Sequence, residues 1–282
     1  MPLTPTHELV EHARAHGRGL GSFNVICVEH AKAIAEAAEH ANLPALLQIS
    51  ENAVRYHGRL APIAAATAAV ARSSSAELGL HLDHVTDVEL LHQGVEHGFT
   101  SAMFDASRLP YDDNVAATRS AAEWAQGHGL WFEAELGEVG GKDGAHAPGA
   151  RTDPAEARAY VDATGVDGLA VAVGNSHAMT RRDARLDLDL VAALAAAVPL
   201  PLVLHGSSGV PDDQLAAAVA AGMVKVNIGT ALNISFTGAV RDALGADQAV
   251  VDPRKYLSTG RSAMRECVEH LLHVLAAKGE TR

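Results

Sequence analysis

The sequence repeats one pattern eight times: a short run of apolar, often β-branched residues, followed by a helical stretch rich in alanine. The runs predict strands at residues 22–27, 45–50, 78–84, 101–107, 130–137, 168–174, 201–207 and 224–229. They are nearly continuous in apolar residues, which is typical of parallel strands buried on both faces. Eight strand–helix units in 282 residues predict an α/β fold, the (β/α)8 TIM barrel.

The connecting helices are expected at residues 29–41, 61–72, 87–94, 113–128, 154–164, 188–197 and 212–221, with the last beginning near 231. Residues 4–16 and 258–277 predict N-terminal and C-terminal flanking helices. A doubly wound sheet is the rival architecture, and it normally opens with a glycine-rich phosphate turn after its first strand. No such turn follows residue 27 and no linker interrupts the pattern, so a single domain over residues 1–282 is expected.

Composition limits the partners and the compartment. A chain with 48% apolar and 20% charged residues is typical of a globular protein. The net charge of −12 argues against nucleic acid as the main partner. We see no secretory signal and no apolar run approaching the roughly 20 residues of a membrane span. Cys27 and Cys267 make no disulfide framework, so a cytoplasmic protein without a membrane partner is expected.

Polar residues stand where the predicted strands end. Because the active site of a parallel barrel lies at the carboxyl ends of its strands, these side chains are expected to converge there. They are Asn24, Ser50, Asp83, His84, Asp105, Ser107, Glu135, His177, His205, Ser207, Ser208, Asn227 and Thr230. Nearly every strand delivers at least one of them, which indicates an enzyme site.

Three of these residues are histidines from three different strands: His84, His177 and His205. Neutral imidazoles in such a triad suit Zn²⁺, and three protein ligands leave an open catalytic position. Asp83 stands directly beside His84, where a carboxylate either transfers a proton on bound substrate or orients a ligand imidazole. The spacing alone leaves both roles open.

Two further features concern the last two strands. Residues 205–209 and 226–230 carry glycines and hydroxyls before helices, a pattern that favours a phosphate site after strands seven and eight. Lys225 lies inside the last strand and is the competing catalyst, because a buried lysine can form a Schiff base with a ketose. An ion pair with an inward carboxylate is the structural alternative, and we favour it.

The motifs resemble those of the class II, metal-dependent ketose-bisphosphate aldolases, in particular the short subgroup with fructose- and tagatose-bisphosphate aldolases. The resemblance covers nearly the whole chain, in family order. The matching segments are GSFNVIC (21–27), LHLDH (80–84), MFDAS (103–107), EAELGEVGG (133–141), VDGLAVAVGNSH (166–177), LVLHGSSGVP (202–211), KVNIGTAL (225–232) and DPRKYL (252–257).

The resemblance implies a lyase that reversibly cleaves a ketose bisphosphate, of the fructose 1,6-bisphosphate or tagatose 1,6-bisphosphate type, to dihydroxyacetone phosphate and an aldehyde such as glyceraldehyde 3-phosphate. It implies Asp83 as the acid/base and a catalytic Zn²⁺, with a monovalent cation, Na⁺ or K⁺, near the phosphate. It also implies a homodimer or homotetramer. The implied zinc ligands are His84, His177 and His205, and Asp105 and Glu135 join His84 at a second metal position. The implied substrate contacts are Asn24 and Asn227 at the ketose, Gly206, Ser208 and Thr230 at its phosphate, and Ser50 with a neighbouring subunit's Arg254 at the distal phosphate.

The chain departs from the family pattern at four places. Lys142 stands where the family has the glutamate that shuttles a proton to the donor carbon, and Ala178, Ser207 and Gly229 replace usual residues around the donor phosphate. Glu138, Asp143 or His146 are the replacements we consider for the missing glutamate. The departures keep two alternatives open: an aldolase paralogue with a different donor or aldehyde, from deoxy-sugar acid phosphate or secondary metabolism, or a metal- and sugar-phosphate-binding barrel without turnover.

Overall fold

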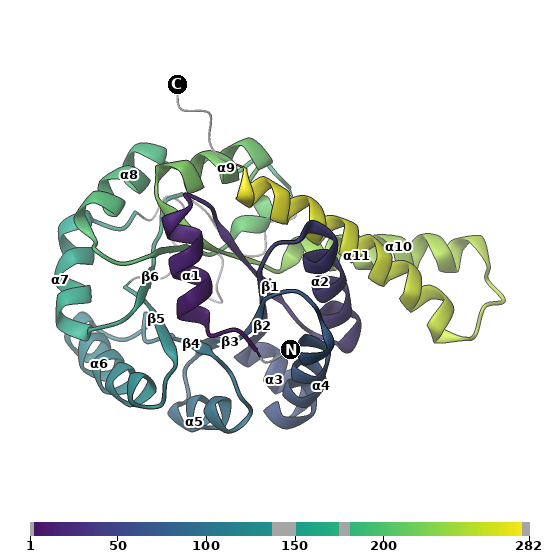
Figure 1. Cartoon of the computed structure of the whole chain (residues 1–282), viewed down its shortest axis with the longest axis horizontal. Helices are drawn as coiled ribbons and strands as arrows, with labels where there is room; N and C mark the ends of the chain where they lie inside the picture. Colours follow the sequence, from purple (N-terminus) through teal and green to yellow (C-terminus); the bar gives the residue numbers. More distant parts are fainter. Residues whose placement is uncertain (1–2, 137–150, 175–180, 278–282) are drawn as a thin grey trace.

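The computed structural model describes residues 3–136, 151–174 and 181–277. Eight parallel strands pair in sequence order and close into a barrel (Figure 1). The strands are β1 (Leu20–Asn24), β2 (Ala45–Ser50), β3 (Leu78–Val85), β4 (Ser101–Phe104), β5 (Trp131–Glu135), β6 (Gly168–Ala170), β7 (Leu202–Leu204) and β8 (Met223–Ile228). The TIM-barrel fold predicted from the sequence is confirmed.

The strand ends differ from the sequence prediction, most clearly in β1, β6 and β7. β6 ends at Ala170 although its apolar run continues to Val173, and β7 ends at Leu204, directly before His205. In both cases the following residues leave the ladder to form the loops at the carboxyl end of the barrel. β1 begins at Leu20 instead of residue 22 and includes Gly21, a residue with poor strand propensity. A Cβ on Gly21 would lie 2.5 Å from the Phe23 ring, so this strand position needs glycine for close packing.

The helices follow the strands as expected, with one addition. They are α1 (Thr6–Ala15), α2 (Val28–Ala41), α3 (Glu51–His57), α4 (Leu60–Ser73), α5 (Val88–Glu96), α6 (Tyr111–Gly127), α7 (Pro154–Thr164), α8 (Leu188–Ala197), α9 (Asp212–Ala221), α10 (Thr230–Ala246) and α11 (Pro253–Ala276), with a short 3₁₀ turn at Ser207–Gly209. α3 was not predicted. The Ser50 hydroxyl caps it by accepting a hydrogen bond from the Ala53 amide at 3.2 Å, and this serine was the available sequence signal.

The flanking helices were predicted and are present. α1 lies across the amino end of the barrel (Figure 1), where its buried face packs on the first residues of the strands. α11 begins at Pro253, earlier than the predicted residue 258, because the Asp252 side chain caps the helix by accepting from the Arg254 amide. α10 and α11 pack on each other and project from the barrel wall (Figure 1). Among the described residues, no helix has the length and apolar character needed to cross a membrane.

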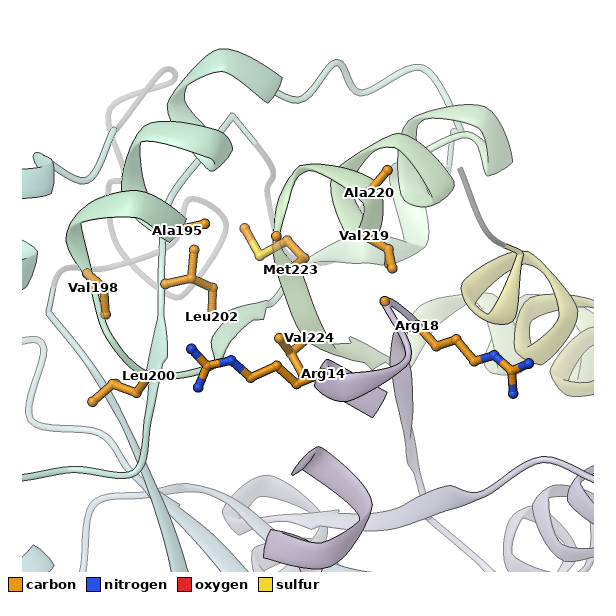
Figure 2. A pocket seen from close by; sticks show the side chains of 12 residues that line it. Arg14, Arg18, Ala195, Val198, Leu200, Leu202, Val219, Ala220, Met223 and Val224 are labelled. Carbon is orange, nitrogen blue, oxygen red and sulfur yellow. The ribbon is translucent and has the colours of Figure 1, made fainter. Parts of the chain in front are cut away.

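A cavity of about 250 Å³ lies beside α1, remote from the carboxyl ends of the strands. Figure 2 shows that apolar side chains surround most of it and that the guanidinium groups of Arg14 and Arg18 point in opposite directions. The Arg14 guanidinium donates to the carbonyl of Pro199 at 3.1 Å. This arrangement lacks the convergent polar groups expected of a catalytic site.

Gly222 lines this cavity and yields a stability prediction. Its φ of +126° is unfavourable for other residues, and an added Cβ would lie 2.4 Å from the Ala195 Cβ. We expect Gly222→Ala to lower the free energy of unfolding by about 1–3 kcal/mol. Gly127→Ala is the matched control, because this exposed helical glycine has no atom within 4 Å of an added Cβ. It is expected to raise stability by up to about 1 kcal/mol. Equal urea midpoints for the two variants would contradict the packing argument.

Candidate active site

The carboxyl ends of the strands surround a cavity of about 210 Å³. It lies within the closed barrel's mouth, so residues far apart in the sequence face one space. Nine of the thirteen strand-end residues line it, together with Gly206: Asn24, Ser50, Asp83, His84, His205, Ser207, Ser208, Asn227 and Thr230. The structure therefore brings together most of the set that the sequence placed at the strand ends.

The end of β3 has an irregular backbone that serves this cavity. His84 has a φ of +49°, in the left-handed region that non-glycine residues rarely adopt. The pairing of β3 with β4 shifts register between Leu82 and Val85, which encloses this residue. In a regular strand Asp83 and His84 would point to opposite sides, but the irregularity turns both toward the cavity. Such local strain is typical of functional sites.

Two imidazoles face each other at the centre of the site. His84 Nε2 lies 3.1 Å from His205 Nδ1, and the two rings are nearly perpendicular, with centroids 4.8 Å apart. The other nitrogen of each ring contacts a carboxylate: His84 Nδ1 lies 2.9 Å from Asp105 Oδ2, and His205 Nε2 lies 2.7 Å from Glu133 Oε1. Carboxylates in this position hold imidazoles for metal binding. The facing nitrogens thus fit a common metal ion.

Two groups of side chains have the donor atoms for a metal. In the first, donor atoms of Asp83, His84 and His205 all lie within 4.8 Å of one another. In the second, the same holds for His84, Asp105 and Glu135. The hydroxyl of Ser107 donates to Asp105 at 2.6 Å and fixes that carboxylate. His177, the third expected imidazole, lies outside the described residues.

Asp83 is buried, with 2% of its surface exposed, and is held by two amides. Gln48 Nε2 donates to Asp83 Oδ2 at 2.9 Å, and Asn227 Nδ2 donates to Asp83 Oδ1 at 3.3 Å. The Ser22 hydroxyl in turn donates to Gln48 Oε1 at 2.5 Å. Neither Gln48 nor Ser22 was predicted from the sequence as part of the site. A glutamine in the middle of the apolar strand ALLQIS was the signal that could have identified the first.

The floor of the site holds a buried ion pair. Lys225 Nζ donates to Glu133 Oε2 at 2.8 Å, and both side chains are fully buried. The favoured interpretation of Lys225 as an ion-paired residue is confirmed. His81, also fully buried, lies beside this pair, and burial followed by the positive charge of Lys225 holds its pKa well below the usual range. Neither Glu133 nor His81 was predicted to be part of the site, although both lie within the motifs EAELGEVGG (133–141) and LHLDH (80–84).

The loops after β7 and β8 form one wall of the cavity. The Ser208 hydroxyl accepts a hydrogen bond from the Ala231 amide at 3.1 Å, at the start of α10. Gly206 has a φ of +60°, which permits the turn. Ser207, which departs from the family pattern, is buried and donates to the Asn227 carbonyl at 2.5 Å. At Gly229, another departure, a Cβ would lie 3.0 Å from Asn24 Oδ1.

The remaining expected residues lie elsewhere. Arg254 is not part of the cavity within its own chain: it is largely exposed near the start of α11 and pairs with Asp252 at 2.7 Å. Two of the four departures from the family pattern, Lys142 and Ala178, lie outside the described residues. The same holds for the three candidate proton shuttles, which are Glu138, Asp143 and His146.

A buried polar site at the carboxyl end of an eight-stranded barrel, with side chains that could hold a metal ion, agrees with the comparisons with known proteins. The family model for class II fructose-bisphosphate aldolase matches residues 4–280. The chain belongs to this family, whose members are aldehyde-lyases, are generally zinc-dependent and act on sugar phosphates. The expectation of a class II aldolase is therefore confirmed, and the alternatives are not favoured.

Individual relatives agree with this assignment. The fructose-bisphosphate aldolases of Staphylococcus aureus and Staphylococcus epidermidis are each 36% identical over 273 residues, covering 95% of this chain and 96% of the relative. Among solved structures, the YdjI aldolase of Escherichia coli K12 is 27% identical, with a TM-score of 0.85 over 99% of this chain and 100% of that one.

Proposed function

We propose that this protein is a zinc-dependent class II aldolase that cleaves a ketose 1,6-bisphosphate of the fructose or tagatose type. The products are dihydroxyacetone phosphate and glyceraldehyde 3-phosphate. One observation carries the proposal: two carboxylate-supported imidazole nitrogens face each other 3.1 Å apart beside a buried aspartate. His84 and His205, completed by His177, would hold the metal. Zinc bound there supplies a Lewis acid for the carbonyl of the donor.

Asp83 is the proposed acid/base. In cleavage it accepts the proton of the hydroxyl on the carbon that becomes the aldehyde, while the carbon–carbon bond breaks and its electron pair stays with the donor fragment. Gln48 and Asn227 each donate to a different oxygen of Asp83, which fixes the position of the carboxylate. A second group must then protonate the donor carbon. Asp105 and Glu135, which share a cluster with His84, are proposed as an alternative metal position.

The substrate contacts follow from the walls of the cavity. The backbone around Gly206, Ser208 and Thr230, at the start of α10, is proposed to bind the donor phosphate with a monovalent cation, Na⁺ or K⁺. Asn24 and Asn227 are proposed to contact the ketose, and Ser50 the distal phosphate.

Arg254 is proposed to reach the distal phosphate of a neighbouring subunit, which requires a homodimer or homotetramer. Its position supports this proposal: the side chain is exposed near the start of the projecting helix α11, outside the cavity of its own chain. We further propose a single domain and a cytoplasmic location.

A coupled assay tests the proposed function. Zinc-loaded protein is mixed separately with fructose 1,6-bisphosphate and tagatose 1,6-bisphosphate, and dihydroxyacetone phosphate is followed by its enzymatic reduction with NADH. We expect cleavage of at least one of them with a kcat of about 1–10³ s⁻¹. Asp212→Asn, a surface change in the ion pair with Arg182, serves as a control that retains activity. Cleavage of neither sugar by the zinc-loaded protein would contradict the proposal.

A further inference from the structure

Lys225 is surrounded by acceptors on the floor of the site. Its Nζ contacts Asn227 Oδ1 at 2.6 Å, Glu133 Oε2 at 2.8 Å and His81 Nε2 at 3.4 Å. An ammonium group has three N–H donors and no acceptor, so each of these atoms must accept. The lysine is fully buried, and these three contacts with described residues offset the cost of burying its charge.

This donation decides how the neighbouring groups are oriented. Because Asn227 Oδ1 accepts from Lys225, its Nδ2 must point to Asp83, where it donates to Oδ1. Because His81 Nε2 accepts, its proton lies on Nδ1 and is donated to the Ser101 hydroxyl at 2.9 Å. The Lys225 ammonium group therefore fixes both the orientation of the Asn227 amide and the tautomer of His81.

The hydrogen bond from Lys225 to Glu133 also determines the tautomer of His205. Within the described part of the chain, His205 Nε2 contacts an acceptor, Glu133 Oε1, at 2.7 Å and a donor, Asn227 Nδ2, at 3.1 Å. Glu133 forms an ion pair with Lys225 through its other oxygen, so its Oε1 is an acceptor, and His205 Nε2 carries the proton and donates it to Glu133. The lone pair of His205 then lies on Nδ1, the atom that faces His84.

We propose that Lys225 is a positioning residue that sets the hydrogen-bond polarity of the active-site floor, and through Glu133 holds His205 in the tautomer that binds metal. The proposal rests on the proposed metal site at His84 and His205. It gives Lys225 a function that requires neither contact with substrate nor a Schiff base.

Swapping the carboxylate for an amide separates positioning from mere structural support. In Glu133→Gln, the Lys225 ammonium group still needs a hydrogen-bond acceptor, so the amide oxygen of the new glutamine is expected to face it. The amide NH₂ then faces His205 Nε2 and drives the proton to Nδ1, so zinc binding is expected to weaken about 100-fold. Adding Lys225→Met frees the amide to turn its oxygen toward His205. The double variant is therefore expected to bind zinc about tenfold more tightly than Glu133→Gln.

The measurement is zinc affinity by competition with a chromophoric chelator, for wild type, both single variants and the double variant. Lys225→Met alone is expected to bind zinc about 10- to 100-fold more weakly than wild type. Leu46→Ala, a buried strand residue packed under α1 at the far end of the barrel, controls for destabilisation and should leave zinc affinity unchanged. A double variant that binds zinc no better than Glu133→Gln would overturn the proposal, because Lys225 would then be only structural.

A second readout needs no metal and keeps the proposal separate from the proposed function. Histidine ¹⁵N chemical shifts of the metal-free wild type should show His81 with its proton on Nδ1 and His205 with its proton on Nε2. In Glu133→Gln the His205 proton should move to Nδ1, and in the double variant, whose amide oxygen is free to face His205, it should return to Nε2. A His205 proton that stays on Nε2 in Glu133→Gln, or that does not return to Nε2 in the double variant, would overturn the proposal. Wild-type protein that shows these tautomers but binds no zinc would contradict the proposed function alone.

Discussion

Replacing Asp83 by asparagine is expected to lower kcat for ketose bisphosphate cleavage by about 10²- to 10⁴-fold, the usual contribution of a positioned acid/base. Asparagine keeps the size of the side chain but cannot accept the substrate proton. The variant should still exchange the donor proton of dihydroxyacetone phosphate, because that step occurs on the other fragment. Steady-state kinetics measure the loss, and NMR in D₂O measures the exchange.

Stability must be followed in the same variant. Gln48 and Asn227 both donate to Asp83, and an asparagine there can accept from only one of them through its single oxygen. The unsatisfied donor is expected to cost about 1–3 kcal/mol of folding free energy. Asp212→Asn, which alters a carboxylate at the start of α9, is the matched control with full activity. An Asp83→Asn variant that is folded and fully active would show that another group is the base.

Removal of bound metal is expected to have the second large effect, a loss of cleavage of about 10³-fold or more, since Lewis-acid assistance contributes several kcal/mol. Incubation with a chelator, gel filtration and assay measure the loss, and added zinc should restore the rate. Added zinc should not restore activity to His205→Ala, because this variant lacks one of the two facing imidazoles.

Borohydride provides the contrasting test. A Schiff-base aldolase is inactivated when borohydride reduces its imine with bound substrate, and Lys225 is the lysine placed inside a strand. Because Lys225 is fully buried and donates to Glu133, we expect no covalent trapping by mass spectrometry. Chelator-resistant cleavage accompanied by a reduced substrate adduct on Lys225 would exclude the metal mechanism.

The sequence predicted the fold because the strand signal is strong in a parallel barrel. Both faces of the strands are buried, so runs such as ALLQIS and LGLHLDH are apolar over most of their length. It also predicted the location of the site, because topology places every polar strand end at one mouth. Asn24, Asp83, His84, His205 and Asn227 lie there as expected.

The floor of the site could not be predicted in the same way. Gln48, His81 and Glu133 lie inside strands, where periodicity shows a polar residue but not the partner that makes it tolerable. Their roles depend on contacts between strands distant in sequence, such as that between Glu133 of β5 and Lys225 of β8. The left-handed backbone conformation of His84 could not be predicted from the sequence either, because few non-glycine residues adopt it and histidine alone does not indicate it.

The most direct test of the central claim, metal-assisted chemistry of a ketose phosphate donor at this cavity, is proton exchange in dihydroxyacetone phosphate. Zinc-loaded protein is mixed with this compound in D₂O, and loss of the hydroxymethyl C–H signal is followed by NMR with and without a chelator. Wild type should exchange the proton only without chelator, Asp83→Asn should still exchange it, and His205→Ala should not. Exchange that persists with chelator or in His205→Ala, or none at all in zinc-loaded wild type, would contradict this account of the site.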